Sequence, residues 1–138
     1  MQPVQKTAGP RSGSAAVELA LVLPLLCFLF VISIDYARVF YFTMTVTNCA
    51  RSGAIYGSQN PTTAKDKTGI EAAARKDAGN LDASKLKVDS APDSDSNPTY
   101  VDVTVTYPFG TISNWPGVGS TTNFTRTIRI TVTPLTPS

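Results

Sequence analysis

Apolar residues gather in one block near the N-terminus of the chain. Residues 19–34 read LALVLPLLCFLFVISI, a stretch of 16 residues without a charged side chain. As a helix this stretch would span about 24 Å, whereas the hydrocarbon core of a bilayer measures roughly 30 Å. Adding residues 14–18 gives 21 residues and a sufficient length. The pattern therefore predicts a membrane-spanning helix that begins at Ser14.

Helical spacing continues beyond the apolar block. Small and apolar residues recur along one stripe from Tyr36 to Ala54. Gly57 and Pro61 then end the pattern, because glycine favours a helix stop and proline removes a backbone donor. One helix over residues 14–57 is expected, and its second half leaves the bilayer as an amphipathic segment.

The C-terminal part of the chain has the pattern of one further helix and a small sheet. Residues 63–79 contain strong helix formers and an apolar face at helical spacing. Three later segments alternate apolar and polar residues, as strands with one buried face do: residues 85–89, 101–106 and 127–132. These elements predict an α+β fold in which a three-stranded antiparallel sheet covers the extended helix.

Charged residues before the block indicate its orientation. Lys6 and Arg11 precede it, so the positive-inside rule keeps the N-terminus in the cytoplasm and exports the bulk of the chain. The expected organisation is a cytoplasmic leader, residues 1–13, a transmembrane and extended helix, residues 14–57, and an exported α+β domain, residues 58–138.

A cleaved secretory signal is an alternative explanation of the block. The short basic start fits it, but residues 34–38, IDYAR, lack the small-x-small site at which such a signal is cut. A lipoprotein signal ending at Cys27 fits less well, since Leu25 and Leu26 stand where small residues are required. A retained membrane helix is therefore the preferred interpretation.

Composition limits the classes of function. The 138 residues include 12 Lys and Arg, 10 Asp and Glu and no His, and the net charge of +2 is too weak to indicate a nucleic-acid partner. Without His the chain lacks the commonest general base and metal ligand. The sequence also has no Gly-rich phosphate loop and no paired-Cys metal motif. We therefore expect no enzymatic activity, no cofactor and no metal site.

Both cysteines, Cys27 and Cys49, fall on the expected long helix. They are 22 residues apart, and about 33 Å of helical rise excludes a disulfide between them, because bridged Cα atoms lie within about 7 Å. Cys27 is expected to face lipid or a packed helix. For Cys49 two alternatives remain open, a buried free thiol and a disulfide between chains.

Glu18 would place a carboxylate at the beginning of the membrane span, which marks it as a functional candidate. In one interpretation it only sits near headgroups at the positive end of the helix. In the other, a peptidase cuts after Gly13, Ser14 becomes the new N-terminus and Glu18 the fifth residue. The freed α-amino group, with a pKa near 8, would then pair with this carboxylate on a neighbouring subunit. The cut also leaves ten basic and ten acidic side chains, because Lys6 and Arg11 are removed.

Three segments together carry a resemblance to a known family. Residues 13–24 read GSAAVELALVLP, residues 34–41 read IDYARVFY and residues 47–54 read TNCARSGA. This pattern resembles the N-terminus of TadE-like proteins, the minor, pseudopilin-like components of the tight-adherence (Flp, type IVb) pilus system of bacteria. Leu19 stands where the family usually has Phe or Tyr.

The resemblance implies a fold, a processing event and partners. The fold would be type IV pilin-like, and a prepilin peptidase would cut between Gly13 and Ser14, with Glu18 and Leu19 in its recognition segment. The other implied partners are further pilus or pseudopilin subunits and the assembly machinery of the inner membrane. The chain would cross that membrane once, with its C-terminal domain exported.

Two further residues leave alternatives open. Pro24 inside the membrane helix is either tolerated or produces a bend that serves packing in a filament. Trp115 lies in a long loop, residues 109–123, and either binds a partner or closes the small core. The binding interpretation supports an alternative function, an uncleaved, single-pass anchored binding module outside the cytoplasm.

Overall fold

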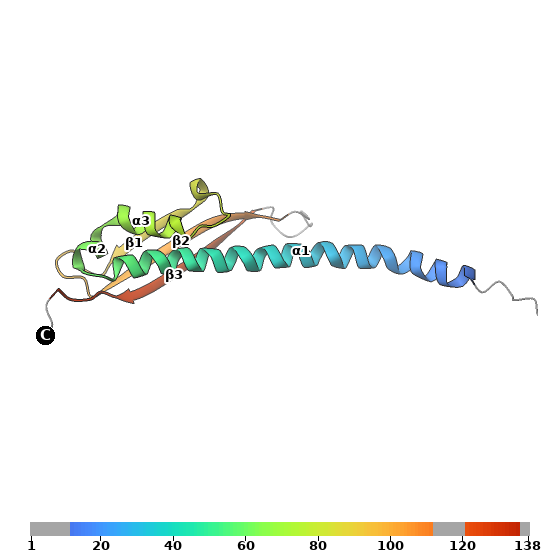
Figure 1. Cartoon of the computed structure of the whole chain (residues 1–138), viewed down its shortest axis with the longest axis horizontal. Helices are drawn as coiled ribbons and strands as arrows, with labels where there is room; N and C mark the ends of the chain where they lie inside the picture. Colours follow the sequence, from blue (N-terminus) through green and yellow to red (C-terminus); the bar gives the residue numbers. More distant parts are fainter. Residues whose placement is uncertain (1–11, 112–120, 136–138) are drawn as a thin grey trace, which may run out of the picture. The chain divides into compact units, whose positions relative to one another are not determined.

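The computed structural model describes residues 12–111 and 121–135, which fall into two units that divide between Ile34 and Asp35. The elements follow the chain in this order: α1 (Ser12–Gly57), α2 (Pro61–Lys65), α3 (Lys67–Lys76), a 3-10 turn η1 (Ala83–Lys85), β1 (Lys87–Pro92), β2 (Tyr100–Gly110) and β3 (Thr121–Thr131) (Figure 1). A long N-terminal helix, a further helix and a three-stranded antiparallel sheet confirm the predicted α+β fold.

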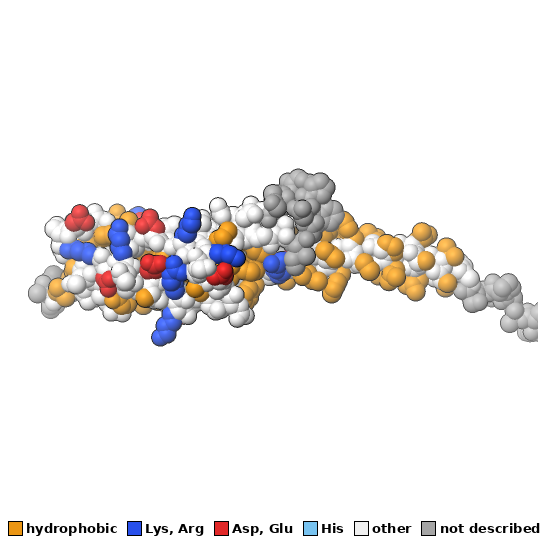
Figure 2. Space-filling view, turned by 90° about the horizontal axis from the view of Figure 1, so that it is seen from above, with side chains coloured by type: hydrophobic (Ala, Val, Ile, Leu, Met, Phe, Trp, Pro, Cys, Tyr) orange, Lys and Arg blue, Asp and Glu red, His pale blue; other side chains and the backbone are white. Residues whose placement is uncertain are grey.

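The first unit contains α1 up to Ile34, and its side chains are almost all apolar. Figure 2 shows apolar side chains covering the visible face of this segment. In the second unit, which begins at Asp35, Lys and Arg side chains are interspersed with Asp and Glu (Figure 2). The segment of α1 from Asp35 to Gly57 belongs to this second unit, together with the sheet.

Two glycines allow α1 to approach its neighbours closely in the second unit. A Cβ atom added to Gly53 would lie 3.2 Å from the Ile70 carbonyl oxygen and 3.2 Å from a methyl group of Val103. A Cβ atom added to Gly57 would lie 3.1 Å from the side chain of Ile70. These glycines are one turn apart, so the same face of α1 contacts both α3 and β2.

The sheet has the order β1-β2-β3, and both pairs are antiparallel. The central strand buries alternate side chains on one face: Val101, Val103, Val105, Tyr107 and Phe109. On the other face, Thr104 and Thr127 are joined by a hydroxyl–hydroxyl hydrogen bond of 2.8 Å. The buried face packs with Val46, Ala50 and Ala54 of α1 in one core.

Cys49 lies fully buried in this core. Burial, and next the negative charge of Asp77, raises the pKa of the Cys49 thiol. The neutral thiol is therefore favoured, which agrees with the buried-thiol alternative. Cys27, in the first unit, is exposed.

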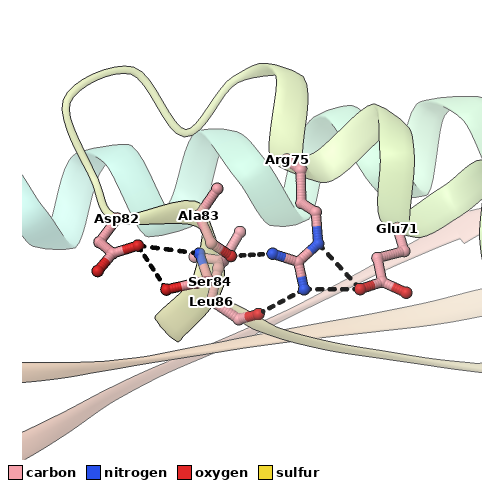
Figure 3. A network of polar contacts seen from close by, with 6 residues as sticks. All are labelled: Glu71, Arg75, Asp82, Ala83, Ser84 and Leu86. Carbon is pink, nitrogen blue, oxygen red and sulfur yellow. Dashed lines mark hydrogen bonds and ion pairs between the residues drawn. The ribbon is translucent and has the colours of Figure 1, made fainter.

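A polar network ties α3 to the turn before β1 (Figure 3). The Arg75 guanidinium donates to Glu71 Oε1 from Nε at 2.9 Å and from Nη2 at 2.7 Å. It also donates to the carbonyl oxygens of Ala83 and Leu86, the latter at 3.1 Å. Asp82 caps η1, since its Oδ1 accepts the Ser84 N–H at 3.1 Å. Arg75 therefore holds the chain where it enters the sheet.

Candidate functional site

The predicted processing residues lie on the first turns of α1. Gly13, Ser14 and Glu18 are all exposed, and a Cβ atom added to Gly13 would meet no atom of the described residues within 4 Å. Gly13 and Ser14 are therefore not packed against other residues that the structure describes.

Ser14 and Glu18 face each other across one helical turn. The Ser14 hydroxyl donates a hydrogen bond to Glu18 Oε1 at 3.2 Å. The sequence predicts that, after cleavage, the Ser14 amino group pairs with Glu18 of a neighbouring subunit, which stays a prediction. Within one chain the helix places both residues on one face. A charge on the Ser14 backbone nitrogen would consequently arise within about one turn of the carboxylate.

The segment after Glu18 is apolar on every side. Twelve large apolar side chains between Val17 and Ile34 are exposed, among them Leu19 at 61%. Burying a Leu or Phe side chain is worth about 1.5–3 kcal/mol, so exposing the whole set to water would cost on the order of 20 kcal/mol. Such a helix requires an apolar surrounding, either lipid or other helices.

A membrane is one such surrounding. Within the part of the chain that the structure describes, α1 is the helix that is long and apolar enough to cross a membrane. In the most apolar 18-residue stretch of this helix, no residue is buried by other residues that the structure describes. The helix is therefore consistent with a single-pass anchor at the N-terminal end.

Pro24 lies inside α1, which continues as one helix on both sides of it. Its ring nitrogen cannot donate to the Ala20 carbonyl oxygen, so one bond of the helical ladder is missing there. Both interpretations of Pro24, tolerance and a functional bend, stay predictions. Trp115 lies outside the described residues, as do the leader residues 1–11.

A second group of residues, at the beginning of the second unit, was not recognised from the sequence. Asp35 is buried and forms an ion pair of 3.4 Å with Arg38, whose guanidinium lies 5.8 Å from the centre of the Phe42 ring and 5.2 Å from that of Phe109. The spacing of Asp35, Arg38 and Phe42 along one helix was visible in the sequence. The contact with Phe109 was not visible in the sequence, because it depends on the register of β2.

The described residues contain no group of three or more His, Cys, Asp or Glu side chains that could hold a metal ion. Asp93, in the acidic β1–β2 connection, instead accepts the backbone N–H groups of Thr99 at 2.7 Å and Tyr100 at 3.1 Å. Its carboxylate closes the turn between the two strands.

Comparison with known proteins identifies the same N-terminal segment. Residues 13–54 match the family described as TadE-like protein, which confirms the predicted resemblance. This family is associated with tight-adherence pilus systems. The matched segment contains Gly13, Glu18 and the first 20 residues of the second unit. Searches of curated proteins and of solved structures gave no match.

Proposed function

We propose that the chain is a membrane-anchored, pseudopilin-like subunit or assembly factor of a tight-adherence (Flp-type) pilus, processed after Gly13. The observation that carries this proposal is the exposed Gly13-Ser14 bond, one turn before Glu18, at the start of a helix that is apolar on every side. In this function the chain is a substrate of a prepilin peptidase and a building block, not an enzyme.

Processing changes the chemistry of the first turn. Hydrolysis of the Gly13-Ser14 bond leaves a carboxylate on Gly13 and an amino group on Ser14, which is largely protonated at neutral pH. Within one chain the Ser14 side chain already reaches Glu18. In an assembly, the Ser14 ammonium of one subunit pairs with Glu18 of its neighbour, and the pair offsets the desolvation that each charge suffers between packed helices.

Processing also releases the anchor. Before the cut, Lys6 and Arg11 hold the N-terminus at the cytoplasmic side of the inner membrane by the positive-inside rule. After the cut, the segment from Ser14 to Ile34 carries one charged side chain, that of Glu18. The assembly machinery can then draw the helix out of the bilayer into a bundle of similar helices, which again keeps its apolar side chains away from water.

Co-expression with the matching peptidase tests the proposal. The membrane-extracted chain is expected to have Ser14 as its N-terminus, and Gly13→Ala is expected to leave most of it at full length. Glu18→Ala is expected to reduce processing and cross-linking between subunits at least tenfold. Asp89→Ala, which removes an exposed carboxylate on the outer face of β1, is the matched control and should behave as the wild type.

Two results would count against this function. One is a chain that stays at full length in the presence of the peptidase. The other is a pair of variants, Gly13→Ala and Glu18→Ala, that are processed and assembled as well as the wild type. An uncleaved chain that still supports adhesion would favour the anchored binding module instead.

A further inference from the structure

A small pocket lies in the second unit where α1, η1 and β2 meet. Its volume is about 180 Å³. The residues that line it are Arg38, Phe42, Lys85, Tyr107, Pro108, Phe109 and Gly110. Among these lining residues the charged ones are Arg38 and Lys85, which are both cationic and come from different elements. A pocket with this lining favours an anionic group.

Aromatic rings hold the Arg38 guanidinium at the pocket. Its central carbon lies 5.2 Å from the centre of the Phe109 ring and 5.8 Å from that of Phe42, within the range of cation–π attraction. Its contact with Asp35 uses Nη1 at 3.4 Å, which is long for a charge-assisted hydrogen bond. A guanidinium has five N–H donors, so the planar group keeps donors for a second oxyanion.

Lys85 supplies a more mobile charge. Its side chain is 61% exposed, and its Nζ lies 3.4 Å from Asp82 Oδ2. Exposed ion pairs of this kind contribute little to the stability of the fold. The other oxygen of Asp82 accepts hydrogen bonds from the backbone N–H and the hydroxyl of Ser84. The ammonium can therefore turn toward an anion beside Arg38 at small cost.

Arg38 lies close along the chain to the end of the uncharged block. It follows Ile34, the last residue of the uncharged block, by four residues, which is about 6 Å of helical rise. The polar headgroup region on each side of a bilayer is roughly 5–8 Å thick. Tyr36 and Phe40 on the same turns of α1 are 76% and 68% exposed, and aromatic side chains gather at membrane–water interfaces.

We propose that Arg38 and Lys85 bind the phosphodiester of an acidic phospholipid in the leaflet where α1 leaves the membrane. The guanidinium fork matches two oxygens of the phosphodiester, and the ammonium adds a point charge. The aromatic walls accommodate the glycerol and the start of the acyl chains. This inference rests on the membrane anchoring in the proposed function, and it does not depend on cleavage after Gly13.

The test measures the lipids retained by the full-length chain. The protein is reconstituted into nanodiscs of equal parts phosphatidylglycerol and phosphatidylethanolamine, extracted gently and examined by native mass spectrometry. Phosphatidylglycerol is expected to be enriched severalfold on the wild type. Arg38→Gln and Lys85→Gln are each expected to lower this enrichment at least threefold. Arg51→Gln, further along α1, and Lys87→Gln, on β1, are the controls and should retain the enrichment.

Several outcomes would overturn the inference. Equal retention of the two lipids by the wild type is one, and unchanged enrichment in both Arg38→Gln and Lys85→Gln is another. Displacement of the lipid by millimolar inorganic phosphate would show a site for free anions rather than for headgroups. Because Lys85 is largely exposed, Lys85→Gln still decides the matter if Arg38→Gln fails to fold.

The two proposals fail in different ways. A chain that alkaline carbonate extracts from membranes is not anchored, and both proposals then fail. A chain that stays in the membrane, keeps residues 1–13 and still enriches phosphatidylglycerol contradicts the processing step alone. A processed chain without lipid preference contradicts only the lipid site.

Discussion

Arg75 shows how much one side chain contributes to the second unit. Its guanidinium donates hydrogen bonds to Glu71 on its own helix and to the carbonyl oxygens of Ala83 and Leu86 on the following turn. The Leu86 side chain is buried, so water does not readily replace the lost donor at this point of the chain. The residue thus links the end of α3 to the start of the sheet.

Arg75→Met is expected to lower the free energy of unfolding by about 1–3 kcal/mol, because two backbone carbonyl groups lose their charged donor. Thermal unfolding of the full chain in mild detergent, followed by circular dichroism, measures the change. Lys76→Met, which alters the exposed neighbouring residue, is expected to leave the midpoint unchanged. An equal effect of the two substitutions would contradict the structural role of Arg75.

The lowered pKa values of three carboxyl groups predict how the stability of the fold depends on pH. The Gly69 backbone N–H, and then the Tyr56 hydroxyl, lowers the pKa of Asp66. Hydrogen bonds from Thr99 lower the pKa of Asp93, and the Arg129 guanidinium lowers the pKa of Asp102. The unfolded chain then binds more protons than the folded one between the two pKa values. The stabilisation is present above about pH 4 and is lost as the pH falls through the folded-state pKa.

Unfolding midpoints measured from pH 7 down to pH 2.5 check this dependence. The wild type is expected to lose stability steeply below about pH 4. Asp66→Asn is expected to be less stable at pH 7 and to show a shallower decline, since one of the linked groups is gone. A control, Asp89→Asn, changes an exposed carboxyl on β1 and should reproduce the decline of the wild type. Parallel curves for Asp66→Asn and the wild type would refute the assignment.

Among the elements, β3 is an edge strand that carries a charge on its inner face. Arg126 lies opposite Val105, which is fully buried, and yet Arg126 is exposed. Its neighbours on the same face, Phe124 and Ile128, are partly buried apolar residues. An inward-pointing charge in the middle of an edge strand is a known protection against pairing with another chain.

Arg126→Val is therefore expected to increase self-association of the full chain in detergent, because it makes the inner face of β3 continuously apolar. Size-exclusion chromatography with light scattering measures the shift toward larger species. Asn123→Val adds the same side chain on the outer face of β3 and keeps Arg126, so it serves as the control. No difference between the two variants would argue against a protective role of the charge.

The observed bounds of the helices and strands show which features the local sequence pattern could predict. Alternation located all three strands, but β1 begins two residues later and ends three residues later than predicted, and β2 and β3 are longer than predicted. Tyr107 pairs with Phe124, and Phe109 with Thr122, through a stretch in which Pro108 favours a turn. The predicted helix over residues 63–79 is divided at Asp66, whose side chain accepts the Gly69 N–H and starts α3. Pairing register and capping decided these boundaries, and neither is a periodic signal.

The two candidate sites also differ in how much of each could be predicted from the sequence. The spacing of Gly13, Ser14 and Glu18 is local, so the sequence alone was sufficient to propose the processing segment. The pocket at Arg38 joins residues from α1, η1 and β2. Its composition follows from tertiary packing, and only the spacing of Arg38 and Phe42 could have been noticed beforehand.

At the scale of the whole molecule, charge and apolar surface are distributed unevenly. The first unit has twelve large exposed apolar side chains between Val17 and Ile34. The sequence of that segment contains one charged residue, Glu18. On the face of the second unit that Figure 2 shows, side chains of both charge signs are interspersed. Residues 1–13 account for the whole net charge of +2, because they contain Lys6 and Arg11 and no acidic residue. Removal of the leader would leave a neutral chain.

The mature N-terminus distinguishes a processed pilus subunit from an uncleaved anchor most directly. Intact-mass analysis of the membrane-extracted wild type, produced with and without the matching peptidase, measures it directly. We predict that the peptidase removes a mass equal to residues 1–13 and leaves a chain that starts at Ser14. A chain of unchanged mass in the presence of active peptidase would contradict processing after Gly13.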